Sequence, residues 1–318
     1  MAANSQGVAA VLADLKGLDF LSSADLNVEQ ILALLELSRQ LKSGERRIDL
    51  GNRVLGLIFT KASTRTRVSF QVAMARLGGQ TVDLNPQLTQ LGRGEPLEDT
   101  ARVLSRFCDV IAVRTFAQQE LIDYAHWASI PVLNALTDLE HPCQALADFL
   151  TMQEAFGELP GQTLAYVGDG NNVAHSLMLC GALLGVSVRI GCPKGFEPLP
   201  EVVNQARNLA VADASIEVIS DPLAAVRGAQ ALYTDVWASM GQEQEQLERE
   251  KAFRGFCLNE DMLAEADPHA IVLHCLPAHR GEEISPGVIE GGSSRIFDQA
   301  ENRLHVQQAL LAAVLGGL

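Results

Sequence analysis

Short apolar runs alternate with segments of helical periodicity along most of the chain, and this alternation constrains the fold more than any other feature. It predicts parallel sheets covered by helices, the α/β class. The segment 157–161, Gly-Glu-Leu-Pro-Gly, interrupts the alternation and divides it into two series. We therefore expect two doubly wound parallel-sheet domains. The predicted boundaries are 1–145 together with a C-terminal helix at 300–318 for the first domain, and 146–299 for the second.

Strands are predicted where apolar runs of strand length occur. In the first series they are 54–60, 80–84, 110–116 and 131–136, and in the second 163–168, 187–192, 216–220, 231–236 and 271–276. Helices are predicted at 27–44, 64–77, 97–107, 118–128, 143–156, 173–184, 199–212, 259–265 and 301–315. The charge-rich stretch 243–250 is interpreted as a solvated helix or a mobile loop.

The composition excludes several classes of protein. The formal net charge of -15 disfavours nucleic acid and anionic membranes as partners. No apolar run reaches membrane-spanning length, and the first residues lack the basic and apolar regions of a secretory signal. The six cysteines form no CxxC pair, which argues against a zinc site or a disulfide framework and favours a reducing cytoplasm.

A polar stretch at 61–67, Lys-Ala-Ser-Thr-Arg-Thr-Arg, follows the first predicted strand and begins a predicted helix. Its hydroxyl and guanidinium groups, together with the N–H groups of a helix N-terminus, all donate hydrogen bonds to an anion. We interpret the stretch as a phosphate-binding turn. The alternative is a polar loop in which Ser63 or Thr64 only caps the helix.

Further polar residues follow other strands, at the edge where open parallel sheets bind their ligands. The first series places Arg114 and His141 there, and the second places Asn172, Asp235 and Cys275. We expect two half-sites facing across a cleft between the domains, one for an anion and one for a cationic or zwitterionic partner.

Each of these residues also has a purely structural interpretation. Arg114 could pair with Asp138 or Glu140, and His141 could be a satisfied structural residue. Asn172 could cap a helix, and Cys275 could be inert core filler.

A dinucleotide site is a competing interpretation, because Gly168-Asp169-Gly170 follows a strand. Val173 stands where the fingerprint needs its third glycine, and no acidic residue ends the next strand. No Walker lysine pattern occurs either. A nucleotide-dependent oxidoreductase is therefore the weaker alternative.

The motifs together resemble the aspartate/ornithine carbamoyltransferase superfamily. Ser63-Thr64-Arg65-Thr66-Arg67 is similar to its carbamoyl-phosphate signature. Three further motifs resemble the ornithine branch of the family: 141–144 (His-Pro-Cys-Gln), 235–241 (Asp-Val-Trp-Ala-Ser-Met-Gly) and 274–277 (His-Cys-Leu-Pro). The resemblance covers essentially the whole chain, with the motifs in the expected order.

The resemblance implies a carbamoyl-phosphate domain, an ornithine domain, and an active site in the cleft between them. The residues that it assigns to carbamoyl phosphate are Ser63, Thr64, Arg65, Thr66, Gln90 (from an adjacent subunit), Arg114, His141, Gln144, Cys275, Leu276 and Arg303. Those that it assigns to ornithine are Asn172, Asp235, Ser239 and Met240. The expected catalytic residues are Arg65, Arg114, His141, Asp235 and Cys275.

The implied reaction transfers the carbamoyl group of carbamoyl phosphate to the side-chain amine of L-ornithine, giving L-citrulline and phosphate in arginine biosynthesis. The resemblance also implies a cytoplasmic homotrimer or a multiple of trimers, with no metal and no organic cofactor. Two alternatives remain open besides the oxidoreductase. One is a sister carbamoyltransferase acting on putrescine or an N-acylated ornithine, and the other is a non-catalytic relative that only binds a ligand.

Overall fold

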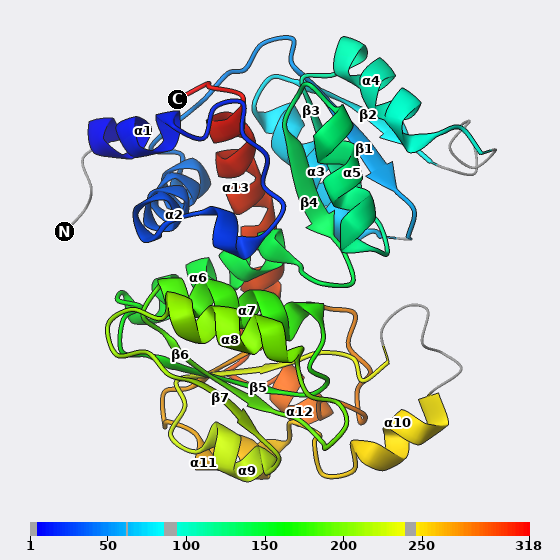
Figure 1. Cartoon of the computed structure of the whole chain (residues 1–318). Helices are drawn as coiled ribbons and strands as arrows, with labels where there is room; N and C mark the ends of the chain where they lie inside the picture. Colours follow the sequence, from blue (N-terminus) through cyan, green and yellow to red (C-terminus); the bar gives the residue numbers. More distant parts are fainter. Residues whose placement is uncertain (1–4, 62, 86–93, 239–245) are drawn as a thin grey trace. The chain divides into compact units, whose positions relative to one another are not determined.

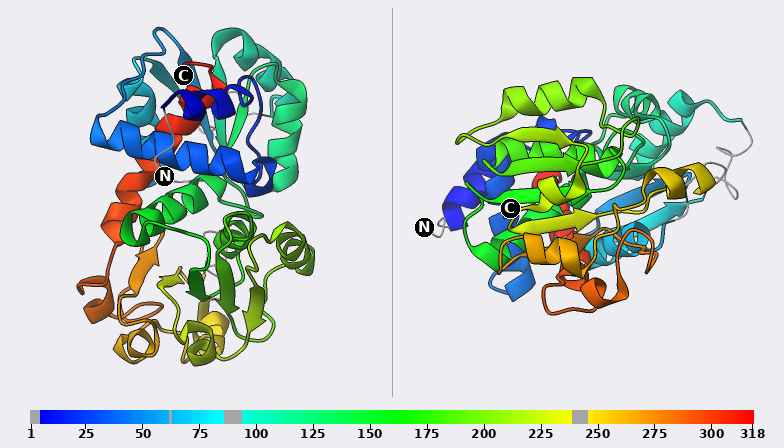
Figure 2. Two further views of the ribbon diagram at one scale, coloured as in Figure 1. Left: turned by 90° about the vertical axis from the view of Figure 1, so that its left-hand side faces the viewer. Right: turned by 90° about the horizontal axis from the view of Figure 1, so that it is seen from below.

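The computed structural model describes residues 5–61, 63–85, 94–238 and 246–318. It divides into two compact units, which are described separately (Figure 1). Unit 1 comprises Met1–Ala147 and Asn302–Leu318, and unit 2 comprises Asp148–Glu301. Each unit contains one parallel sheet with helices on both of its faces, so the predicted α/β class is confirmed (Figure 2).

The sheet of unit 1 has four parallel strands in the order β2-β1-β3-β4. They are β1 (Val54–Phe59), β2 (Gln80–Leu84), β3 (Val110–Arg114) and β4 (Val132–Leu136). The helical segments wholly within this unit are α1 (Ser5–Ala13), η1 (Ser23–Asp25), α2 (Val28–Ser43), α3 (Arg65–Arg76), α4 (Leu97–Phe107) and α5 (Gln118–Trp127).

Helices α4 and α5 cover one face of this sheet, and α3 lies on the other (Figure 1). On the first face Leu104 of α4 and Leu121 of α5 pack with Ile58 and Val113 of the sheet. The order of the strands reverses between β1 and β3, since β2 lies on one side of β1 and β3 on the other. Right-handed crossovers place the connecting helices on opposite faces after such a reversal.

The sheet of unit 2 has five parallel strands in the order β7-β6-β5-β8-β9. They are β5 (Thr163–Val167), β6 (Ser187–Gly191), β7 (Ile216–Ile219), β8 (Ala231–Thr234) and β9 (Ile271–His274). The helices wholly within this unit are α7 (Asn172–Leu183), α8 (Pro200–Leu209), α9 (Pro222–Val226), α10 (Gln246–Ala252), α11 (Glu260–Glu265) and α12 (Pro286–Ile289).

Helices α7 and α8 cover one face of this second sheet, while α9 and α11 cover the other (Figure 1). The core on the second face joins Leu232 and Val272 of the sheet to Val226 of α9 and Met262 of α11. The order of the strands reverses between β5 and β8.

The boundaries between the units fall inside two helices, α6 (Pro142–Phe156) and α13 (Ile296–Val314). The sequence predicts the last helix from residue 301, but α13 begins five residues earlier. Arg303 therefore lies inside the helix and not at its start.

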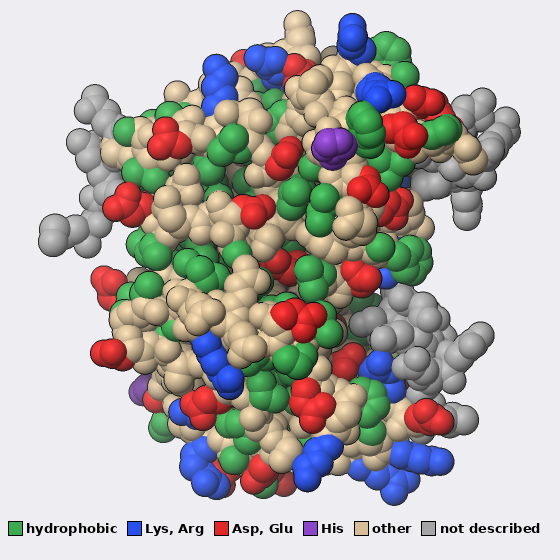
Figure 3. Space-filling model, viewed as in Figure 1, with side chains coloured by type: hydrophobic (Ala, Val, Ile, Leu, Met, Phe, Trp, Pro, Cys, Tyr) green, Lys and Arg blue, Asp and Glu red, His purple; other side chains and the backbone are tan. Residues whose placement is uncertain are grey.

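All nine predicted strands are confirmed to within two residues at each end. Four short elements, α1, η1, α9 and α12, are not predicted from the sequence, because their few residues give little periodic signal. On the face shown in Figure 3, acidic and basic side chains are interspersed over the surface. Within the described ranges, none of the helices combines the length and the apolar character needed to cross a membrane.

Candidate functional site

The polar residues of unit 1 gather where the strand order reverses, which is where open parallel sheets bind their ligands. Ser63 and the residues after it follow β1, and Arg114 is the last residue of the neighbouring strand β3. We call Ser63, Arg65, Thr66, Arg114, His141 and Arg303 the anion cluster.

Hydrogen bonds bring the anion cluster together from three parts of the sequence. Arg114 Nη1 lies 3.3 Å from Ser63 Oγ and 3.4 Å from Thr66 Oγ1. Arg303 of α13, itself buried, donates from Nη2 to the same Thr66 hydroxyl. Two guanidinium groups thus meet at one threonine, in the first turn of α3.

His141 lies among the same guanidinium groups. It is buried, and burial is the largest cause of a pKa well below the usual histidine range. The next causes are the positive charges of Arg303, Arg114 and Arg65, in that order. The imidazole is therefore neutral near pH 7, and can donate one hydrogen bond without adding a charge.

The N-terminus of α3 is the second source of donors. Thr64 is the N-cap residue, with φ −79° and ψ −56°, and its side chain makes no capping hydrogen bond. The alternative in which Thr64 only caps the helix is thus wrong. Arg67, one of the two arginines in the phosphate-binding motif, pairs with Asp83 and stacks over Phe59. Its guanidinium group therefore links α3 to the sheet and is not part of the anion cluster.

The two carboxylates considered as structural partners of Arg114 bind other groups. Asp138 Oδ1 accepts from the Gln118 N–H at 3.0 Å, and Glu140 accepts from Ser22 Oγ and the Ser23 N–H.

The residues that follow His141 begin α6. Gln144 is buried in the first turn, and its N–H donates to the His141 carbonyl at 3.0 Å. Burial raises the pKa of Cys143 to about 12, so that its thiol stays protonated. The thiol lies 3.4 Å from the Asn134 carbonyl, to which it donates.

The polar residues of unit 2 also gather at a reversal of strand order, here between β5 and β8. Asp235 follows β8 and is buried. Its Oδ2 accepts from Asn171 Nδ2 at 2.9 Å, while its Oδ1 accepts from the Val236 N–H at 2.8 Å and from Cys275 Sγ at 3.0 Å. We call Asn171, Asp235 and Cys275 the Asp235 cluster. Among the described residues, every hydrogen bond to Asp235 comes from a neutral donor, so its negative charge is not neutralised.

A second buried acid at this edge is neutralised. Asp169, two residues beyond β5, accepts from Arg249 Nη1 at 2.8 Å. The same nitrogen donates to the Trp237 carbonyl at 2.8 Å, and the guanidinium lies over the Phe196 ring. Arg249 belongs to α10, inside the stretch interpreted as solvated, but its side chain is buried. That part of the interpretation is wrong, because an internal ion pair draws this one residue inward.

Asn171 takes the role that the sequence analysis considered for Asn172. Its side-chain oxygen caps α7 by accepting from the N–H groups of Val173 and Ala174, while its nitrogen donates to Asp235. Asn172 is the first residue of α7 and is half-buried. The asparagine pair is visible in the sequence, but only the structure decides which one reaches the carboxylate.

The glycine pattern after β5 has a local explanation. A Cβ on Gly170 would meet the backbone of Pro198 at 2.2 Å, so glycine is needed for the approach of the protein's own chain. This removes the main support for a dinucleotide site.

Cys275 and Leu276 follow β9, and the turn that they form has an unusual backbone. Leu276 has φ +59°, in the left-handed region. Its N–H donates to Nδ1 of His274 at 2.8 Å.

Among the described residues of unit 2, two groups of side chains have the spacing of metal ligands: Asp235, His274 and Cys275, and His279, Glu282 and Glu283. In the first group the His274 nitrogens bond Leu276 and Glu283, and the thiol bonds Asp235. The potential ligand atoms of this group are thus already engaged in hydrogen bonds within the protein. The expected absence of a metal stays a prediction.

Three predicted site residues, Gln90, Ser239 and Met240, lie outside the described residues.

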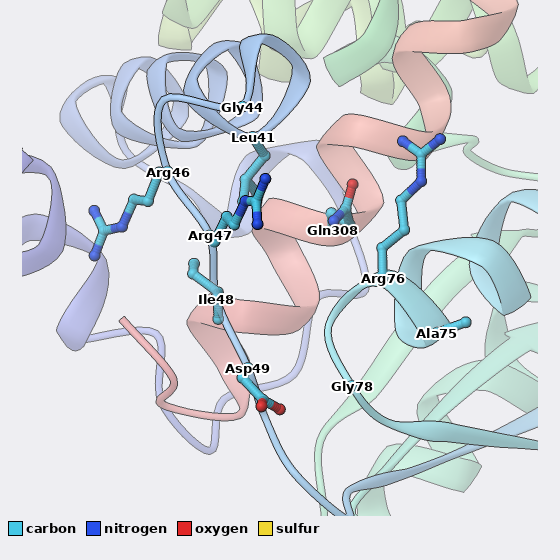
Figure 4. A pocket seen from close by; sticks show the side chains of 10 residues that line it. All are labelled: Leu41, Gly44, Arg46, Arg47, Ile48, Asp49, Ala75, Arg76, Gly78 and Gln308. Carbon is cyan, nitrogen blue, oxygen red and sulfur yellow. The ribbon is translucent and has the colours of Figure 1, made fainter.

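Unit 1 also contains a cavity of about 500 Å³ that is separate from the anion cluster (Figure 4). In the figure the Gln308 amide lies between the side chains of Arg47 and Arg76, whereas Arg46 points away from them. Arg76 ends α3, about 16 Å along the helix from Arg65 at 1.5 Å per residue. None of the predicted site residues lines this cavity.

Comparisons with known proteins agree with the motifs. Residues 18–154 match the family model of the aspartate/ornithine carbamoyltransferase carbamoyl-P binding domain, and residues 160–314 match that of the Asp/Orn binding domain. The ornithine carbamoyltransferase of Prochlorococcus marinus (strain MIT 9313) is 88% identical over 318 residues, covering 100% of both chains.

Two solved structures extend the likeness to the fold. The ornithine carbamoyltransferase of Pyrococcus furiosus is 48% identical with a TM-score of 0.92, covering 96% of this chain and 99% of its own. That of Gloeobacter violaceus is 55% identical with a TM-score of 0.86, covering 94% and 98%.

Proposed function

This chain belongs to the aspartate/ornithine carbamoyltransferase family, and from that premise we propose that it is an enzyme that transfers the carbamoyl group of carbamoyl phosphate to the side-chain amine of L-ornithine. The products are L-citrulline and phosphate. The observation that most directly supports this proposal is that the two clusters have opposite charge. The anion cluster is rich in guanidinium groups, whereas the Asp235 cluster contains a carboxylate whose described hydrogen-bond donors are all neutral.

The anion cluster would hold carbamoyl phosphate. Ser63, Thr64, Arg65 and Thr66 would bind the phosphate through hydroxyl, guanidinium and first-turn N–H groups. Arg114, His141, Gln144 and Arg303 would bind the carbamoyl group, with Arg114 also reaching the phosphate.

The Asp235 cluster would hold ornithine. Asp235 would accept a hydrogen bond from the ammonium group of the amino acid, and a charge-assisted bond of this kind is stronger than a neutral one. Asn172, Ser239 and Met240 complete the proposed ornithine site, and Cys275 with Asp235 would orient the attacking nitrogen.

The chemistry that these residues support is a direct attack. The neutral side-chain amine attacks the carbamoyl carbon, the carbamoyl oxygen gains negative charge, and phosphate leaves with the electrons of the C–O bond. Arg65, Arg114 and His141 donate toward the oxygens where charge develops, which lowers the barrier electrostatically. The departing phosphate accepts the proton from nitrogen, so that no covalent enzyme intermediate is needed.

The proposed assembly is a homotrimer or a multiple of trimers, in which Gln90 would come from an adjacent subunit. Cys275 and Leu276 would also contact carbamoyl phosphate. The proposed setting is arginine biosynthesis in the cytoplasm. Both proposals are supported by the membership of the family.

One assay tests the proposal: citrulline formation from carbamoyl phosphate and ornithine, repeated with putrescine and with N-acetylornithine. Ornithine should be used far better than either alternative, because N-acetylornithine has no α-ammonium for Asp235 and putrescine has no carboxylate for the polar partners of a zwitterion. Arg65→Ala should reduce turnover about a hundred- to a thousandfold, as the loss of one transition-state donor does. Arg67→Ala is the matched control, since it removes a guanidinium bound to Asp83, and it should cost less than about tenfold. Equal losses in the two variants, or a preference for putrescine, would contradict the proposal.

A further inference from the structure

The turn that carries Cys275 and Leu276 is held by a buried pair of side chains, His274 and Glu283. Both side chains are 0% exposed, and His274 Nε2 lies 3.0 Å from Glu283 Oε1. Neither residue belongs to the sites assigned above.

The hydrogen bonds around His274 define a single state of its ring. The Leu276 N–H donates to Nδ1, so Nδ1 has no proton, and the proton on Nε2 points to Glu283. The main-chain N–H of His274 donates to Gln299 Oε1 at 2.8 Å, which fixes the backbone at the end of β9.

Glu283 is itself anchored. Its Oε1 also accepts from the His279 N–H at 2.6 Å, and its backbone carbonyl accepts from the Leu258 N–H at 2.8 Å. The loop that follows the turn thus places the Glu283 carboxylate against His274, the residue that precedes the turn.

The bond from Leu276 N–H to the imidazole holds a leucine in the left-handed region, at φ +59°, a conformation that L-residues rarely adopt without support. The adjacent Cys275 thiol donates to Asp235 at 3.0 Å. A change in the turn would therefore displace Cys275 from Asp235.

We propose that Glu283 and His274 are positioning residues for the transfer reaction. Glu283 selects the tautomer of His274, His274 fixes the N–H of Leu276, and the turn so formed sets Cys275 against Asp235. This inference rests on the proposed function, because the effect on catalysis needs that reaction as its readout.

Substitutions of Glu283 separate the hydrogen-bond acceptor from the charge. Glu283→Gln keeps an oxygen that can accept from both His274 and His279, and should retain most of the wild-type kcat/KM for ornithine. Glu283→Ala removes the acceptor and should lower kcat/KM about a hundredfold, the cost of misplacing reacting groups by about 1 Å. Glu282→Ala is the matched control, because it removes the adjacent carboxylate, which is partly exposed. This variant should leave kcat/KM unchanged.

A second variant leaves the buried carboxylate paired in case Glu283→Ala does not fold. His274→Gln retains a donor at the ε position for Glu283 but places no acceptor at the δ position, where Nδ1 of His274 accepts from the Leu276 N–H. It should lose activity as Glu283→Ala does.

Hydrogen exchange at the Leu276 amide provides a readout that does not depend on catalysis. Exchange should accelerate in Glu283→Ala and His274→Gln and stay unchanged in Glu283→Gln and Glu282→Ala. Wild-type kcat/KM in His274→Gln, or a loss in Glu283→Gln as large as in Glu283→Ala, would overturn the proposal. A wild-type enzyme that makes no citrulline but shows this exchange pattern would refute the proposed function alone.

Discussion

Asp235→Asn is the substitution that most directly tests how the Asp235 cluster binds a cation. Two buried acids lie at the same edge of the second sheet, and within the part of the chain that the structure describes only Asp169 has a guanidinium partner. Asp235 accepts from an amide, a backbone N–H and a thiol, all of them neutral. The substitution therefore removes the charge that the ammonium group of ornithine is proposed to use, without changing the shape of the side chain.

The magnitude follows from the burial of the carboxylate. Loss of one partner of a buried, hydrogen-bonded charge pair costs about 2 to 5 kcal/mol, which is about 30- to 4,000-fold in kcat/KM for ornithine. The effect on stability should be smaller. The amide introduced by the substitution can still accept from Val236 and Cys275, but its nitrogen would face Asn171 Nδ2. The Asn171 amide must then turn over, which weakens its capping of α7 by about 1 kcal/mol.

The assay is steady-state citrulline formation with ornithine varied at saturating carbamoyl phosphate, accompanied by thermal melts. Asp169→Asn is the matched comparison. It leaves Arg249 buried without its anion and should cost about 3 to 5 kcal/mol of stability, with a smaller change in kcat/KM per folded molecule. If Asp169→Asn impairs ornithine use as much as Asp235→Asn does, the distinction between the two acids is incorrect.

Three further predictions concern buried ionisable side chains. The pKa of His141 is lower in the folded than in the unfolded state, so below about pH 6.5 only the unfolded state takes up a proton on this residue. Urea titrations should therefore show that the free energy of unfolding decreases by about 1.4 kcal/mol for each unit by which the pH is lowered below about 6.5. The variant His141→Asn should lack this contribution to the pH dependence. Arg303→Met should weaken carbamoyl phosphate binding, measured by calorimetry, by about 1.5 to 3 kcal/mol, because it removes a charged hydrogen bond. Arg249→Gln should lower the melting temperature and the folded-state order of the Trp237 region measured by tryptophan fluorescence, whereas the exposed Arg254→Gln should change neither.

The sequence was sufficient to predict the strands and the sheet edges that carry the polar residues. Alternating apolar runs and helical periodicity are local signals, and the strand-end rule then locates Ser63, Arg114 and Asp235 without any knowledge of packing. The family resemblance added Arg303, which no local pattern marks.

Side-chain partners could not be predicted in the same way. Arg65 and Arg67 are chemically equivalent in the sequence, and only the position of Asp83 on the adjacent strand β2 draws one of them away. Arg249 lies among charged residues that suggest a solvated surface, yet its partner Asp169 is 80 residues away. Glu283 resembles any other loop carboxylate until the fold places it against His274.

The uncapped start of α3 has a thermodynamic consequence for the molecule as a whole. Thr64 supplies no side-chain acceptor to the first turn, so the dianion proposed to bind there would complete the helix that holds it. A ligand that binds only the folded form stabilises that form by mass action. Carbamoyl phosphate alone should then raise the unfolding temperature measured by calorimetry, and the increase should grow with its concentration.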